Sequence, residues 1–137
     1  MNELIKKTLI KLLKKATKKQ EIPVAALIEQ NGKIISKAYN KRVKSHDVTD
    51  HAEVRAIRKA ERKIKDWRLN GYNMYVTLEP CEMCKNIIKE ARIDNCFFYL
   101  KKDKQSNLNI HTKICYKQTE FSNLFEKILK DSFKKMR

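Results

Sequence analysis

Apolar side chains recur at helical spacing near both ends of the chain. Between residues 4 and 16 they alternate with lysines at intervals of three and four residues, and a similar pattern returns between residues 121 and 136. This periodicity predicts an amphipathic helix in each segment. A basic amphipathic helix can lie on a membrane surface, but an apolar stripe more often packs on a core, and we favour the core for residues 4–16.

A β-hairpin is predicted next. Residues 21–30 form an apolar, β-compatible run, and residues 33–39 form a second one. Asn31-Gly32 lies between them and is a strong short-range signal for a two-residue hairpin turn. Residues 41–50 are polar and typical of a loop.

The rest of the chain alternates between helix-like and strand-like patterns. Apolar spacing predicts a helix that begins near Asp50 and reaches about residue 64. The segments that follow are predicted as a strand over 72–78, a helix from Pro80 to about residue 92, and strands over 96–100 and 112–117. The resulting order, αββαβαββα, favours an α/β protein in which helices flank one sheet.

The length of 137 residues fits a single domain over residues 1–137, large enough to bury a core. We find no run of eighteen apolar residues and no secretory signal pattern, so no membrane span is expected. Two of the four cysteines, Cys96 and Cys115, fall in predicted strands rather than at disulfide-like spacings. We therefore expect free thiols and a reduced, cytoplasmic setting.

The formal net charge is +16. Lysine supplies 25 of the 32 basic residues, a bias that genome composition alone can produce. Such a bias would tend to enrich glutamate too, yet only 16 residues are acidic. We therefore favour a polyanionic partner, of which nucleic acid is the commonest.

Four residues form a split motif with metal-binding character. His51 and Glu53 precede Cys81 and Cys84 by about thirty residues. One imidazole and two thiolates are the ligands of some catalytic zinc sites, which leave a fourth position open. Both halves of the motif fall at predicted helix starts, where the positive end of the helix dipole stabilises thiolates. Cys81 and Cys84 are about one helical turn apart, so both can coordinate the same ion.

Each residue also has a structural interpretation. The two cysteines could be a redox pair or half of a four-cysteine zinc site, and His51 could be a core histidine. Glu53 could close a capping box with Asp50 as N-cap. We favour the joint explanation, because the H-x-E…P-C-x-x-C pattern is typical of zinc-dependent nucleoside and nucleobase deaminases. It predicts that Glu53 takes a proton from water and returns it to the substrate.

Several stretches resemble the bacterial tRNA-specific adenosine deaminases. The stretches are residues 21–26 (EIPVAA), 39–40 (YN), 46–53 (HDVTDHAE), 67–69 (WRL), 75–84 (YVTLEPCEMC) and the final FKKMR. The family converts adenosine to inosine at the anticodon wobble position. The resemblance implies a three-layer α/β/α cytidine deaminase-like fold with a central mixed five-stranded sheet, and a homodimer that acts on the anticodon stem-loop of a tRNA.

The same resemblance assigns roles to individual residues. It makes His51, Cys81 and Cys84 the ligands of one Zn²⁺ per subunit, and Glu53 the catalytic proton shuttle. It makes Asn40 a contact to the flipped base, although an asparagine there is also typical of a turn.

The chain departs from the family over residues 101–111, where a shortened, glycine-free segment replaces a Gly-rich one. Asp103 and His111 are weak matches to family residues in this segment. Three other functions stay open. They are deamination of a free nucleobase or nucleoside at the same zinc site, RNA binding with a structural zinc, and membrane-surface binding through the first helix.

Overall fold

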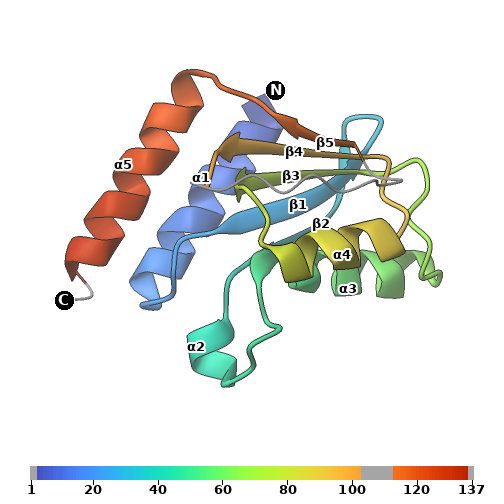
Figure 1. Ribbon diagram of the computed structural model, residues 1–137, viewed down its shortest axis with the longest axis horizontal. Coiled ribbons are helices and arrows are strands. Elements are labelled where there is room, and N and C mark those ends of the chain that lie inside the picture. Colours follow the sequence, from blue (N-terminus) through green and yellow to red (C-terminus); the bar gives the residue numbers. More distant parts are fainter. Residues whose placement is uncertain (1–2, 103–112, 136–137) are drawn as a thin grey trace.

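A computed structural model describes residues 3–102 and 113–135 of the chain (Figure 1). The elements, in chain order, are α1 (Glu3–Lys18), β1 (Ala25–Gln30), β2 (Lys33–Tyr39), α2 (Arg42–Ser45), α3 (Ala52–Ile64), β3 (Asn73–Leu78), α4 (Glu82–Glu90), β4 (Asn95–Leu100), β5 (Lys113–Tyr116) and α5 (Glu120–Lys135).

The five strands form one mixed sheet in the order β2-β1-β3-β4-β5. β1 pairs antiparallel with β2 and β3, whereas β3–β4 and β4–β5 are parallel. The predicted hairpin is confirmed: Gln30 pairs with Lys33, and Asn31 and Gly32 both have positive φ, as a primed turn requires. The predicted five-stranded mixed sheet is therefore also confirmed.

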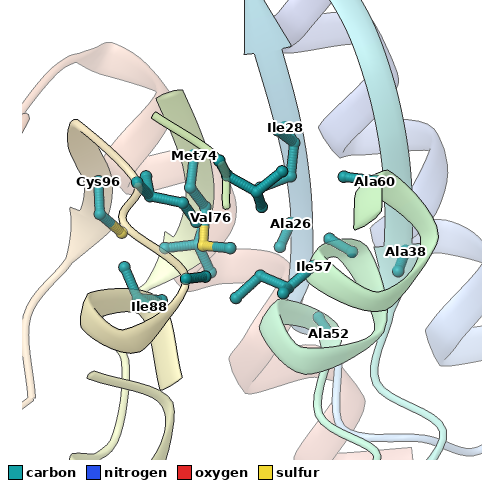
Figure 2. Packing of buried hydrophobic residues seen from close by; sticks show 14 of the residues in the cluster. Ala26, Ile28, Ala38, Ala52, Ile57, Ala60, Met74, Val76, Ile88 and Cys96 are labelled. Carbon is teal, nitrogen blue, oxygen red and sulfur yellow. The ribbon is translucent and has the colours of Figure 1, made fainter. Parts of the chain in front are cut away.

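Helices cover both faces of the sheet, in three layers (Figure 1). Successive side chains of a strand point to opposite faces. Leu27 of β1 accordingly packs with α1 and α5, in a cluster that includes Leu9, Tyr99 and Phe125. Its neighbour Ile28 packs on the other face, among side chains of α3 and α4 (Figure 2). β1 is buried along almost its whole length because both its faces are covered.

The apolar stripe of α1 packs on the core, as predicted. Its buried side chains are Ile5, Leu9, Leu12, Leu13 and Ala16. No helix in the described part of the chain combines the length and apolar character needed to cross a bilayer. All four cysteines are free thiols.

The structure corrects two predicted segments. Residues 21–24 lie outside β1, since Pro23 offers no backbone donor to a sheet and Glu21 turns inward to be buried. The predicted loop over 41–50 contains the single-turn helix α2. The buried Glu21 carboxylate stabilises this turn by accepting bonds from the N–H groups of Val43 and Lys44, at 3.0 and 2.8 Å.

Candidate active site

Two helix starts meet at one edge of the sheet. Ala26 of β1 pairs with Val76 of the antiparallel strand β3, so the start of β1 and the end of β3 lie together. α3 and α4 begin beside this edge, together with the C-terminal end of α1 and with α2 (Figure 1). Residues distant in sequence thus converge there.

His51 and Cys81 are the N-cap residues of α3 and α4. Both helices begin one or two residues later than the sequence predicted, so these two side chains lie just before the first turn rather than within it. The capping-box interpretation of Glu53 is wrong for the same reason. Asp50 lies outside the helix, where its carboxylate accepts a bond from the Ser45 hydroxyl and pairs with Arg58 at 3.4 Å.

The three soft donor atoms form a compact triangle. The Nδ1 atom of His51 lies 3.5 Å from the Cys84 Sγ and 3.8 Å from the Cys81 Sγ, and all three donors lie within 4.8 Å of one another. In a tetrahedral zinc site with ordinary bond lengths, two such ligand atoms are about 3.6 Å apart. The donor types and their spacing therefore fit zinc.

One thiol of the cysteine pair is already poised to lose its proton. A hydrogen bond with the Cys84 thiol is the main cause that lowers the pKa of Cys81, to about 5, while the same bond raises the pKa of Cys84. The two sulfurs thus share one proton, as expected where a thiolate forms readily at a helix start. Cys96 and Cys115 lie outside this cluster, which argues against a four-cysteine site among the described residues.

Glu53 is almost completely buried beside the cysteines. Burial raises the pKa of its carboxyl to about 7, and the negative charge of Cys81 acts in the same direction. A carboxyl group with a pKa near the working pH can both accept and release a proton. This is the property that acid–base catalysis requires.

A cavity of about 150 Å³ opens beside these residues. Side chains of Ile22, Val24 and Leu78 give it apolar walls, and its polar lining comes from Asn40, Arg42, His51, Glu53, Glu79, Cys81 and Lys102. Whole-ligand pockets usually measure roughly 300–1,000 Å³. The cavity is therefore suited to a single base.

Asn40 stabilises a turn of the backbone and also lines the cavity. Its Oδ1 accepts a bond from the Arg42 N–H at 3.1 Å, which helps to begin α2. The buried side chain also borders the cavity. The turn uses one lone pair of the oxygen, and the amide NH₂ group is the donor that Asn40 can offer to a base.

Sequence reasoning missed a buried ion pair beside the motif. The Glu79 carboxylate accepts bonds from the Lys85 ammonium at 3.0 Å and from the Lys102 N–H at 2.9 Å. Glu79 and Lys85 immediately flank the Pro80–Cys84 motif, and both are buried. Their position beside the motif is the only sequence signal, since charged residues are usually predicted to be exposed. Asp103 and His111 lie outside the described residues.

The chain matches known proteins over most of its length. The family model for the cytidine and deoxycytidylate deaminase zinc-binding region matches residues 1–100. The chain belongs to this deaminase family. A tRNA-specific adenosine deaminase of Rickettsia bellii is 38% identical over 134 residues, which cover 89% of this chain and 92% of that protein. Alignments with the relatives from Bacillus subtilis and Aquifex aeolicus cover 60% and 61% of those proteins, whereas the alignment with the Rickettsia typhi relative covers 95%.

Two solved structures share the fold. One, from a study of A-to-I editing by tRNA:A34 deaminases at the wobble position of transfer RNA, has a TM-score of 0.74 at 27% identity and covers 82% of this chain and 95% of its own. The other, a guanine deaminase from Bacillus subtilis, has a TM-score of 0.65 at 33% identity, with coverages of 74% and 66%. The cytidine deaminase-like fold is thereby confirmed.

Proposed function

We propose that the protein is a hydrolase that converts adenosine to inosine at the wobble position of a tRNA anticodon. The main support for this activity is the site itself. His51, Cys81 and Cys84 form a triangle of zinc-type ligands beside the buried Glu53, at a cavity of the size of one base. Relatives from Rickettsia bellii and Rickettsia typhi, which match over 92% and 95% of their own lengths, are tRNA-specific adenosine deaminases. The strongly positive charge of the chain agrees with an RNA substrate.

In this proposal, His51, Cys81 and Cys84 hold one Zn²⁺ per subunit. When bound, the ion supplies a Lewis acid that lowers the pKa of water at the open position. Replacing Cys84 with serine should abolish zinc binding, as measured by elemental analysis. The matched control is Cys96→Ser, a buried cysteine outside the triangle, which should keep zinc. Equal zinc content in both variants would contradict the assignment.

Glu53 carries the protons of the reaction. Water adds to the ring carbon that bears the exocyclic amine, and Glu53 accepts the proton that this water loses. The carboxyl group then gives this proton to the adjacent ring nitrogen. It next takes the proton of the added hydroxyl group and passes it to the amine, which leaves as ammonia while the ring carbon becomes a carbonyl. One buried group can perform both transfers because its pKa lies near neutrality.

Asn40 and the apolar walls position the base. A nucleotide must leave its stack to reach the cavity, at a cost of a few kcal/mol that is lowest in a single-stranded loop. Ile22, Val24 and Leu78 offer apolar contacts to the faces and edges of the base. The Asn40 amide NH₂ donates a hydrogen bond to it.

We include a homodimer and a cytoplasmic location in the proposal. Trp67 is 55% exposed and borders a hollow on α3 and α4, whose lining combines apolar side chains such as Ile87 with the charged Arg58, Glu61 and Glu90. An exposed tryptophan beside apolar side chains is typical of an interface.

Residues 1–137 would form one deaminase domain, since α1 and α5 pack together on the same sheet.

Deamination of a free base is the second candidate. The likeness to a guanine deaminase and the small cavity favour it. Purified protein should therefore be incubated with tRNA transcripts, adenosine, guanine and cytosine, with release of ammonia and inosine at the anticodon as readouts. Inosine in tRNA supports the main proposal. Ammonia from free bases alone would overturn it in favour of the second candidate.

A further inference from the structure

The cavity leaves most of a nucleic-acid substrate outside. Its volume of about 150 Å³ suits one base, so the flanking nucleotides must bind elsewhere on the surface. Phosphate contacts supply a large part of the affinity of proteins for nucleic acids. A surface that can make them should be basic, exposed and close to the cavity.

The outer face of α1 is a regular stripe of cations, which we call the α1 lysine stripe. All its members are exposed: Lys7, Lys11, Lys14, Lys15 and Lys18. At 100° per residue they fall within an arc of about 100°, opposite the apolar side that packs on the sheet. From the first lysine to the last, the stripe is about 16 Å long, which is long enough to contact several phosphates.

The stripe has fewer acidic neighbours than α5 or the surface around Arg58 and Arg68. Residues 3–19 contain seven lysines and one acidic residue, Glu3, which lies at the far end next to Lys6. On α5, by contrast, Lys130 pairs with Glu126 at 3.1 Å. On the α3 side, Arg58 pairs with Asp50 and Arg68 with Asp66. The positive charge of α1 is the least compensated of these surfaces.

The stripe leads to the cavity. Glu21, three residues after Lys18, ties the end of α1 to α2 through its bonds to Val43 and Lys44. The next residue, Ile22, lines the cavity, whose wall also carries Arg42 from α2. A nucleic-acid backbone that lies along α1 would therefore reach the opening of the cavity. It would meet the lysines on α1 and Arg42 at the cavity wall.

We propose that the α1 lysine stripe binds the phosphate backbone of the RNA stem whose loop places a base in the cavity. The inference rests on the proposed function and adds a second contact surface to it. Anionic lipid is a poorer match for the stripe. A membrane-bound amphipathic helix inserts its apolar side into the bilayer, whereas Leu9 and Leu13 of α1 are fully buried against the sheet.

The test compares two variants that lose equal charge. One is Lys11→Gln/Lys14→Gln/Lys18→Gln; the control is Lys33→Gln/Lys63→Gln/Lys113→Gln, which changes exposed lysines elsewhere. Binding of a tRNA transcript is measured by fluorescence anisotropy across a salt series. Log K falls as log salt rises, and each lost phosphate contact makes this slope shallower by about 0.7–0.9. We expect a decrease of about 2 for the α1 variant and a much smaller one for the control.

Further readouts separate the possible failures. If the wild-type protein forms no inosine in tRNA, the proposed function fails. If it forms inosine and the two variants have equal salt slopes, the stripe proposal alone fails. Binding to phosphatidylglycerol vesicles through the stripe, with RNA affinity unchanged, would overturn it in favour of a membrane. Should the α1 variant misfold, lysine acetylation of wild-type protein replaces it: RNA should protect the stripe lysines but not Lys33, Lys63 or Lys113.

Discussion

The candidate active site and the α1 lysine stripe are built in opposite ways. In the active site, a few buried groups such as Glu53 and Cys84 have neighbours that determine their protonation. In the stripe, five exposed lysines carry similar charges in similar surroundings. Loss of one group should therefore disable the first region, whereas the second should lose affinity in proportion to the charge removed.

The largest effect is expected at Glu53. Glu53→Gln keeps the shape of the side chain but removes the proton acceptor, so inosine formation should fall on the order of a thousandfold. Binding of tRNA should stay unchanged, because the phosphates contact other residues. Single-turnover rates and anisotropy measure the two quantities separately. A variant that retains most of its rate would contradict the shuttle role.

A smaller loss is expected at Asn40. Asn40→Asp keeps an oxygen that accepts the Arg42 N–H but removes the amide donor. The variant should fold normally and lose about 10- to 100-fold in kcat/KM, the value of one or two hydrogen bonds to the base. Circular dichroism checks the fold. If the rate is unchanged, Asn40 only stabilises the turn.

The buried carboxyl group should also affect stability in protein stripped of metal. Burial raises the pKa of Glu53 from 4.5 to about 7 in the folded state. The folded protein therefore binds this proton more tightly than the unfolded chain does. The resulting stability is complete below about pH 4.5 and is lost as the pH rises through 7. Glu53→Gln should thus match the wild type at pH 4.5 and exceed it by up to about 3 kcal/mol at pH 8.

Denaturant unfolding at both pH values measures this difference. The exposed Glu120 provides the control, since Glu120→Gln should change stability equally at pH 4.5 and pH 8. If Glu53→Gln behaves in the same way as this control, the pKa of Glu53 is not raised and the comparison between the two regions is weakened.

The smallest effect is expected on α5. Lys127→Gln/Lys130→Gln/Lys134→Gln removes as many charges as the α1 variant, but Glu126 and Asp131 lie among these lysines. We expect the affinity for tRNA at a fixed salt concentration to fall only about twofold to threefold, since a partly neutralised surface attracts phosphates weakly. A loss as large as that of the α1 variant would show that total charge, and not its placement, controls binding.

Periodicity and turn chemistry predicted most elements correctly. The apolar stripe of α1 and the Asn31-Gly32 hairpin are local features that the structure confirms. The single-turn helix α2 could not be predicted, because its bonds come from Glu21, about twenty residues earlier. The starts of α3 and α4 were misplaced by one or two residues. At α3 the reason is that Asp50 bonds with neighbouring side chains instead of capping the helix.

The sequence determines which zinc ligands are available, and the tertiary structure determines where they lie. The residue types at 51, 53, 81 and 84 establish by themselves which groups are available and that two cysteines are one turn apart. Pairing of β1 with β3 brings the histidine within 4 Å of both sulfurs. Spacing along the chain limits only local geometry, whereas proximity across thirty residues, and the burial that shifts the pKa of Glu53, arise when the sheet and its helices pack.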